Sequence, residues 1–553
     1  MLKILNKKNI VNLIFVLIIL LAGFLRVYRL GEVPKGLQND EASFLINSSS
    51  ILETLKDEDG QFLPIQLNSL MDPKPALYSY LQIPFLVIFG NNTFASRLPS
   101  ALIGIVSIFL FYLLIKKLTK NNSLALLGMI LLSVSPWHIV NSRATEEVIL
   151  SFTFLLANLI FFLKITKDKK INLIYYILFF LTALLGMYSY HSNKIVLLGF
   201  YSTYLLLNLL VKNTKKEVKK RSLILFLLTF FSFLLTLSSA LTRFSAIGVL
   251  GNDLPKALIF EFTTKSTGQT PLLLIRAFYN KPFFYFRYFL ENYLAHFDLN
   301  YLFVSGGATK RFIVLQHGLF YFFEIIFLFF GSLQLLKNKK YKNLTFIILT
   351  LLILTPIPAA LTIEEIPSSI RPFNLILPLI LIVILGFEYI FNLIKNIKPS
   401  WKFLLIIFTT LVYVWGLAYF IQQYFVLTPI LSVSYRSRNY EITALRIKDK
   451  IDDYDKIVFT NDLRGVYIYL WLEGLISIPE IQVQPLARYQ QNYFLKKFIF
   501  SQDSCSFPDY DGKVLYVTPA SCRSHRPNNL KTLEQTYLDD GVELGFLFSE
   551  KLK

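Results

Sequence analysis

Residues 10–30 read IVNLIFVLIILLAGFLRVYRL, and this run decides the class of fold. It is long enough to cross the hydrocarbon core of a bilayer, which takes about 20 apolar residues. Lys3, Lys7 and Lys8 precede the run, so the positive-inside rule keeps the start of the chain in the cytoplasm. A cleaved signal peptide is the alternative, but no clear small-x-small cleavage site precedes the polar stretch that follows. We predict that this run is the first membrane span. Arg26 and Arg29, near its end, extend the helix into the outer interface.

The composition of the 553-residue chain extends this conclusion to the whole molecule. Hydrophobic residues make up 54% and charged residues 17%, with a mean hydropathy of +0.51, which excludes a soluble multidomain protein. The net charge of +20 would suit a nucleic-acid partner in a soluble protein. Here most of it lies in short basic clusters between apolar runs, so it indicates topology and no nucleic-acid binding. The clusters predicted to be cytoplasmic lie at 116–120, 164–170, 212–221, 337–342 and 395–402.

The apolar runs between these clusters predict an all-α polytopic protein of the cell (plasma) membrane. About eleven spans are expected, near 10–30, 94–115, 124–141, 144–163, 171–190, 194–211, 222–241, 312–336, 342–360, 372–394 and 401–420. An odd number places the C-terminal end outside. The outer connections are then 31–93, 137–145, 188–194, 242–311, 361–371 and everything after 421.

The tail after residue 420 changes character. Short β-type apolar runs near 455–461 and 512–518 alternate with segments that could be helical, which predicts a small extracytoplasmic α/β domain. We therefore expect a membrane domain at 1–420, with its first outer loop at 31–93, and a C-terminal domain at 421–553. Cys505 and Cys522 both fall in the tail. A disulfide and two free thiols both remain open without geometry.

The first outer loop carries adjacent acids, Asp40 and Glu41, just after the first span. A carboxyl group near an apolar bilayer surface has a raised pKa and can act as a base at neutral pH. Adjacent acids are common in solvated loops, but the position of this pair favours a site. The same loop contains an aromatic-rich stretch at 78–89 that is too short to span, so we expect it to lie in the membrane interface.

The outer tip at 135–147 also carries unusual polar residues. His138, Arg143, Glu146 and Glu147 would be costly at membrane depth without partners or a polar cavity. The alternative is a capped turn, with the two glutamates near a helix N-terminus.

Two further outer segments carry cations. Isolated residues such as His191 and Lys194 are more often interface residues than ligands. Arg371 begins a returning span and faces either lipid headgroups or an anionic ligand, for which a guanidinium group is suited. Together the outer tips predict a site that takes a lipid-linked anion from the bilayer. They do not name the reaction.

The order of these motifs resembles the glycosyltransferase C-fold superfamily, and within it the bacterial relatives of protein O-mannosyltransferases and of the lipid A aminoarabinose transferase. The resemblance covers roughly residues 10–395. It is carried by Asn39-Asp-Glu-Ala, Asp72-Pro-Lys-Pro, Phe94-Ala-Ser-Arg-Leu-Pro-Ser-Ala-Leu-Ile-Gly, Ser135-Pro-Trp-His-Ile with Ser142-Arg143, Tyr188-Ser-Tyr-His-Ser, Thr355-Pro-Ile-Pro-Ala-Ala-Leu-Thr and Ile370-Arg-Pro-Phe-Asn.

The resemblance implies transfer of a sugar from a polyprenyl-phosphate donor to an acceptor outside the membrane, usually with inversion. By similarity, Asp40 is the base that deprotonates an acceptor hydroxyl, and Glu41 supports it. The leaving group is a phosphate, so cations are expected to assist its departure. The candidates are Lys74, Arg143, Lys194 and Arg371, with His138 and His191 as further site residues. Asp72 is expected to orient Lys74 or to bind a divalent ion, and the proline between them leaves metal binding open.

Two other classes compete with this prediction. A flippase or transporter of lipid-linked oligosaccharides would be expected to show internal repeats, and none is convincing. An O-antigen polymerase or ligase would lack the acid pair after the first span. The chain has no Gly-rich nucleotide loop, which argues against direct use of a nucleotide sugar. Neither the sugar nor the acceptor (protein, lipid or glycan) follows from the residues.

Overall fold

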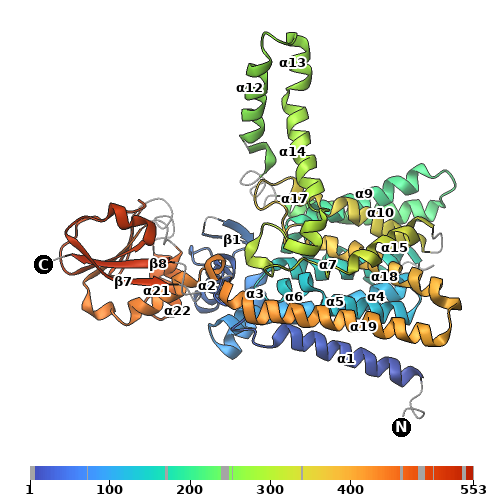
Figure 1. Ribbon diagram of the computed structural model, residues 1–553, viewed down its shortest axis with the longest axis horizontal. Helices are drawn as coiled ribbons and strands as arrows, with labels where there is room; N and C mark the ends of the chain where they lie inside the picture. Colours follow the sequence, from blue (N-terminus) through green and yellow to red (C-terminus); the bar gives the residue numbers. More distant parts are fainter. Residues whose placement is uncertain are drawn as a thin grey trace. The chain divides into compact units, whose positions relative to one another are not determined.

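The computed structural model describes residues 7–70, 72–167, 172–237, 248–251, 253–337, 341–431, 433–460, 465–483, 492–501, 503–537 and 544–551 (Figure 1). The chain divides into two compact units. Unit 1 comprises Met1–Tyr28, Ser100–Arg143 and Glu147–Phe420, and unit 2 comprises Arg29–Pro99, Ala144–Glu146 and Ile421–Lys553.

Unit 1 is helical. Its helices are α1 (Lys7–Val27), most of α4 (Thr93–Thr119), α5 (Asn122–Val134), α6 (Pro136–Ser142), α7 (Glu147–Lys167), α8 (Leu173–Ser189), α9 (Ser192–Leu210), α10 (Lys216–Leu235), α12 (Leu254–Ser266), α13 (Leu272–Phe278), α14 (Lys281–Ala295), α15 (Glu324–Lys337), α16 (Lys342–Leu354), α17 (Ile357–Ala360), α18 (Ile376–Leu393) and most of α19 (Pro399–Gln422).

Each of the eleven predicted spans overlaps a helix. In the described part of the chain, seven helices are long and apolar enough to cross a membrane, and α5 with α6 makes an eighth if the bent pair is one span. The bend of 59° falls at Pro136, which cannot continue the hydrogen-bond ladder of α5. The other three predicted spans overlap α8, α10 and α15, so the count of about eleven stays a prediction. The chain is a multi-pass membrane protein.

Small residues allow the closest packing between helices of unit 1. A Cβ atom at Gly331 of α15 would collide with the backbone of Ile382 in α18, and one at Gly386 of α18 would collide with the backbone of Phe327. The rings of Phe327 and Phe387 stack beside this contact with centroids 3.8 Å apart. Without a hydrophobic driving force in lipid, such backbone approach is a main source of helix association.

Unit 2 contains the first loop and the tail. The loop forms α2 (Asn39–Thr54), the antiparallel pair β1 (Gln66–Ser69) and β2 (Asp72–Pro75), and α3 (Leu77–Phe89), which contains the aromatic-rich stretch at 78–89. The tail forms the helices α20 (Thr428–Leu431), α21 (Arg438–Lys448), α22 (Val466–Leu472) and α23 (Ile478–Gln482). Its strands are β3 (Lys456–Phe459), β4 (Tyr493–Leu495), β5 (Phe498–Phe500), β6 (Val514–Pro519), β7 (Leu530–Tyr537) and β8 (Leu544–Lys551).

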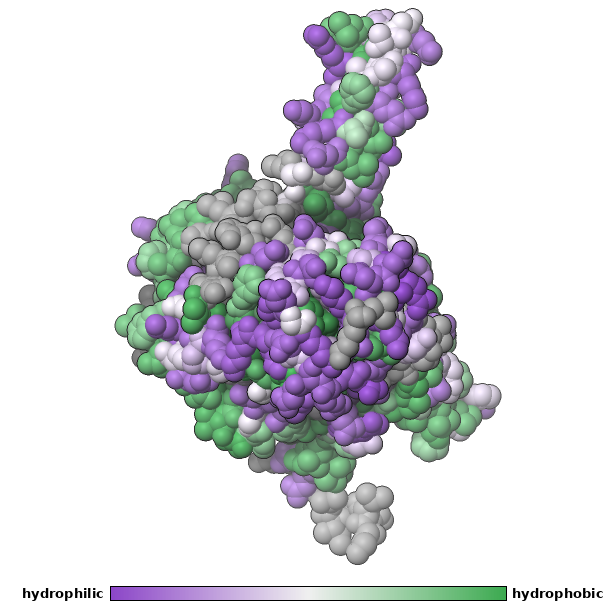
Figure 2. All heavy atoms as spheres, turned by 90° about the vertical axis from the view of Figure 1, so that its left-hand side faces the viewer, coloured by the Kyte–Doolittle hydropathy of each residue, from purple (hydrophilic) through white to green (hydrophobic). Residues whose placement is uncertain are grey.

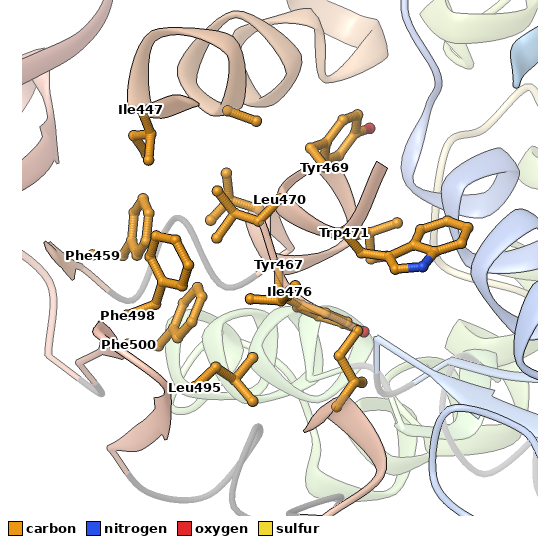
Figure 3. Close-up of a cluster of buried hydrophobic side chains, with 14 of the residues drawn as sticks. Ile447, Phe459, Tyr467, Tyr469, Leu470, Trp471, Ile476, Leu495, Phe498 and Phe500 are labelled. Carbon is orange, nitrogen blue, oxygen red and sulfur yellow. The ribbon is translucent and has the colours of Figure 1, made fainter. Parts of the chain in front are cut away.

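The tail strands form one mixed sheet in the order β4-β5-β3-β6-β8-β7, with β3 parallel to both β5 and β6. This sheet with its helices confirms the predicted small α/β domain. Side chains point to alternate faces along a strand, and Phe459, Phe498 and Phe500 lie on the face of the sheet that packs against α21 and α22 (Figure 3). Leu45 and Ile46 of α2 belong to the same core, so the first loop and the tail fold as one body.

Cys505 and Cys522 form a disulfide, which answers the question that the sequence leaves open. The bridge ties the segment before β6 to the short helical turn after it. Structural disulfides persist in oxidising compartments, and this one supports the proposed extracytoplasmic position of the tail.

Candidate active site

The acid pair lies at the first turn of α2. Gln38 is the N-cap residue, and its backbone N–H donates to Glu41 Oε2 at 3.2 Å. Consecutive residues of a helix point about 100° apart, so the two carboxylates enter different environments. The Asp40 side chain is 30% exposed, whereas the Glu41 side chain is fully buried. Both lie at the helix N-terminus, where the peptide dipoles favour negative charge.

Asp40 is paired with Lys74. The Lys74 ammonium donates to Asp40 Oδ1 at 2.6 Å and lies 3.8 Å from Asp72 Oδ2. Asp72 and Lys74 are two residues apart on β2, which puts both side chains on one side of the strand. The lysine side chain is 6% exposed, and its ammonium lies 5.3 Å from the centroid of the Phe44 ring. This geometry supports the expectation that Asp72 orients Lys74.

Glu41 is held by two arginines. Arg97 donates to both of its oxygens, from Nε at 2.8 Å and from Nη2 at 3.0 Å, and Arg436 donates to Oε2 at 2.5 Å. The backbone of Thr145 donates to Oε1 at 3.0 Å. Burial alone would raise the pKa of the Glu41 carboxyl, but the charges of Arg97 and Arg436 outweigh it and lower that pKa to about 2. The expected raised pKa is therefore wrong for Glu41, because its arginine partners were not foreseen.

The two arginines are the site residues that sequence reasoning missed. Arg97 also donates to the carbonyl oxygens of Leu30, Pro34 and Gly36, so it fixes the loop that leads into α2. Arg97 belongs to the motif that begins at Phe94. A buried arginine at the start of an apolar span indicates an acidic partner. Arg436 lies 395 residues from Glu41 along the chain, and no local pattern pointed to it.

The tip between α6 and α7 joins this network through its last residues. Gln38 Nε2 donates to Glu146 Oε1 at 2.8 Å, and the hydroxyls of Ser96 and Thr145 lie 2.8 Å apart. Glu146 is nearly fully buried. Thr145 and Glu146 thus make hydrogen bonds with the acid-bearing loop and α4, while Glu147 begins α7.

His138 lies in the interior of unit 1. Arg26 Nη2 lies 2.8 Å from His138 Nδ1, and His138 Nε2 lies 2.8 Å from the Ser107 hydroxyl. A guanidinium group only donates, so Nδ1 accepts and the proton resides on Nε2, which donates to Ser107. Arg26 is fully buried and also donates to the carbonyl of Ser133. Arg26 is thus held by acceptors of the bent α5–α6 pair, and its predicted level at the outer interface stays a prediction.

Arg143 is likewise buried and serves the packing of unit 1. It caps the C-terminus of α6, and its Nη1 donates to the carbonyl oxygen of Leu25 in α1 at 3.0 Å. Whether it also meets a donor phosphate stays a prediction.

The structure brings His191 and Lys194 together and places the backbone of Arg371 beside them. Lys194 Nζ lies 3.0 Å from His191 Nδ1 at the start of α9. Ser192 Oγ donates to the carbonyl of Arg371 at 2.7 Å, which joins this tip to the segment before α18. The Arg371 guanidinium pairs with Glu364 at 2.8 Å.

The candidates thus do not form one cluster. Asp40, Asp72 and Lys74 meet in unit 2, with Glu41 beside them on α2 but paired with arginines. In unit 1, His191 and Lys194 lie at the start of α9 beside the Arg371 backbone, and His138 and Arg143 lie elsewhere in the interior. In the described ranges, no three His, Cys, Asp or Glu side chains are grouped to hold a metal ion. A divalent ion at Asp72 therefore stays a prediction.

Comparisons with known proteins agree with the resemblance. Residues 73–236 match the family model described as dolichyl-phosphate-mannose-protein mannosyltransferase. An uncharacterized protein of Aquifex aeolicus (strain VF5) is 28% identical over 160 residues, which span 28% of this chain and 30% of that relative. The match thus covers less than a third of the relative's own length.

Two solved structures align with most of the chain. The archaeal oligosaccharyltransferase AglB from Archaeoglobus fulgidus, in complex with an inhibitory peptide and a dolichol-phosphate, aligns with 92% of this chain and 69% of that chain, with a TM-score of 0.50 and 13% identity. ArnT from Cupriavidus metallidurans bound to undecaprenyl phosphate aligns with 99% of this chain and 98% of that chain, with a TM-score of 0.41 and 10% identity. This chain has a glycosyltransferase C-fold and, through residues 73–236, is related to the protein mannosyltransferases.

Proposed function

We propose that the protein transfers a sugar from a polyprenyl-phosphate donor to an acceptor on the outer face of the membrane. The observation that carries the proposal is the pairing of a partly exposed carboxylate, Asp40, with a nearly buried ammonium group, Lys74, at 2.6 Å. A base for the acceptor and a cation for the donor phosphate thus lie side by side. The segment that matches the mannosyltransferase model includes Lys74, Arg143 and Lys194.

The chemistry assigns opposite roles to the adjacent acids. Asp40 takes the proton of the acceptor hydroxyl, whose oxygen bonds to the anomeric carbon. The bond from that carbon to the phosphate oxygen breaks, and the electron pair leaves on polyprenyl phosphate, with inversion at the anomeric carbon. Glu41 cannot share the role of base, because it is buried and already accepts from Arg97 and Arg436. It positions the helix end that presents Asp40.

Lys74 connects the two halves of this reaction. In the structure it neutralises Asp40, and a carboxylate in such a pair is a weaker base. A donor phosphate that attracts the Lys74 ammonium would release Asp40 at the moment that the donor is bound. Asp72, 3.8 Å away, keeps the lysine in reach of both partners. Lys194 and Arg371 are the proposed phosphate ligands of unit 1.

The transporter alternative makes a different prediction about the donor. A flippase moves a lipid-linked sugar across the bilayer without breaking the bond to phosphate, and an O-antigen polymerase or ligase needs no base beside the first span. The family match and the Asp40–Lys74 pair favour the transferase.

The test is release of undecaprenyl phosphate by the full chain in nanodiscs. Undecaprenyl-phosphate hexoses and pentoses serve as probes, with an envelope extract as the source of acceptor. Asp40→Asn keeps size and hydrogen bonding but removes the base, so turnover should fall by at least about a hundredfold. The matched control is Glu32→Gln, because Glu32 lies in the same loop and forms only an exposed pair with Arg29.

The control should leave turnover unchanged. Turnover by Asp40→Asn at the level of the parent would contradict the role of Asp40. Transbilayer movement of an intact lipid-linked sugar by the parent, without release of undecaprenyl phosphate from any probe, would favour the transporter.

A further inference from the structure

The helical hairpin at residues 254–295 has no role in the proposed reaction. It consists of α12, α13 and α14 and projects from unit 1 across the direction of α1 and α19 (Figure 1). Its two arms are held together by an aromatic cluster, in which the Phe262 ring lies 5.8 Å from that of Tyr279 and 5.9 Å from that of Phe284. The hairpin is therefore a folded element with an inner face of its own. Below it is called the crosswise hairpin.

The root of the crosswise hairpin is fixed at the end of a candidate span. Asn292 Nδ2 donates to the carbonyl of Thr362 at 3.2 Å, and the Tyr293 hydroxyl donates to the carbonyl of Ile353 at 3.0 Å. Thr362 lies just beyond the Lys342–Ala360 span, and Ile353 lies within that span, one residue before the end of α16. The candidate spans in α1 and α19 cross the direction of the hairpin, so an element with this orientation follows the surface of the bilayer (Figure 1).

The outward face of the crosswise hairpin is apolar. In α14 the exposed side chains Phe283, Phe286, Leu290 and Leu294 recur at spacings of three, four and four residues, which places them on one stripe. At the tip, Leu272, Leu273 and Leu274 are exposed, and Leu273 reaches 82%. Figure 2 shows hydrophobic and hydrophilic residues side by side along this projection.

The charged residues of the tip itself, Arg276 and Lys281, are both cations. Further along the two arms, Lys265 pairs with Glu261 at 2.5 Å and Arg287 pairs with Glu291 at 2.8 Å. Exposed leucine and phenylalanine beside lysine and arginine are the pattern of a helix that lies in a membrane interface and meets anionic headgroups.

We propose that the crosswise hairpin lies on the bilayer surface, with its tip and the α14 stripe inserted among acyl chains and its cations on anionic headgroups. The occupant of this face is the lipid of the same membrane. The inference stands on the hairpin alone and does not depend on the transfer reaction. Its consequence is a second anchor for the membrane unit beside the spans.

The experiment places a fluorescent label at the tip of the full chain in nanodiscs. Leu273→Cys is labelled with a nitrobenzoxadiazole maleimide, and the natural cysteines do not react because they form a disulfide. The matched control is Lys531→Cys on β7, where the side chain is exposed on a sheet. Lipids that carry a doxyl group on the acyl chain quench a label inside the bilayer, and iodide quenches a label in water.

The Leu273→Cys label should be quenched by the doxyl lipids and protected from iodide, and the Lys531→Cys label should show the reverse. Adding Arg276→Gln or Lys281→Gln should weaken insertion about fivefold for each cation in phosphatidylglycerol, and less in phosphatidylcholine. Equal iodide quenching at both positions would overturn the proposal. So would protection of the tip that appears only when another protein is added, because the face would then be a protein interface.

Discussion

Replacing Glu41 by Gln should destabilise the fold far more than the size of the change suggests. The variant keeps the shape of the side chain and removes the charge that neutralises Arg97 and Arg436. Both arginine side chains are buried, at 0% and 2% exposure, so neither can turn to water for compensation. Two guanidinium groups would then face each other without a counter-charge.

The magnitude follows from the environment of the carboxyl group. Its pKa falls from 4.5 to about 2, and a shift of that size corresponds to about 3 kcal/mol of the free energy of unfolding. Removal of one partner from a buried ion pair typically costs about 3–5 kcal/mol. We therefore expect Glu41→Gln to lose about 3–5 kcal/mol.

The assay is unfolding by urea of the full chain in detergent micelles, followed by tryptophan fluorescence. Glu32→Gln is again the matched control, since an exposed pair contributes about 0–1 kcal/mol. The double variant Glu41→Gln with Arg436→Gln should lose less free energy of unfolding than the sum of the two single variants, by about 0.5–3 kcal/mol. The reason is that the double variant removes a buried cation together with its counter-charge. A Glu41→Gln variant within about 0.5 kcal/mol of the parent would refute the reasoning.

Three further outcomes are expected. The folded-state pKa of Glu41 is depressed, so its contribution to stability is complete above pH 4.5 and is lost as the pH falls towards about 2. The difference in the free energy of unfolding between the parent and Glu41→Gln should therefore shrink over that pH range. A difference that stays constant would contradict the pairing with the arginines. Arg371→Lys should raise the apparent requirement for the lipid-linked donor roughly tenfold, because a lost charge-assisted pair is worth about 1.5–3 kcal/mol, while acceptor dependence stays unchanged in kinetic titrations. In intact cells, a cysteine at exposed Asn300 should react with an impermeant reagent and one at exposed Ser400 should not; the reverse pattern would invert the proposed topology.

The sequence determined the class of the protein, and each span that it predicts overlaps a helix. A membrane helix is recognised from a continuous apolar run, because its apolar side chains contact the lipid of the bilayer and its backbone hydrogen bonds lie within the helix. Neither depends on a distant segment of the chain. The break between α5 and α6 also has a local cause, because Pro136 interrupts the helix at that position. The acid pair after the first span and the α/β tail were also found from local patterns.

Only the tertiary structure decided what each polar residue does. Asp40 and Glu41 are neighbours in sequence, yet one is partly exposed beside Lys74 and the other is buried between two arginines. Arg436, one of those arginines, comes from the far end of the chain. The protonation and role of a buried group depend on partners that the fold brings from distant segments, and no local pattern of residues contains that information.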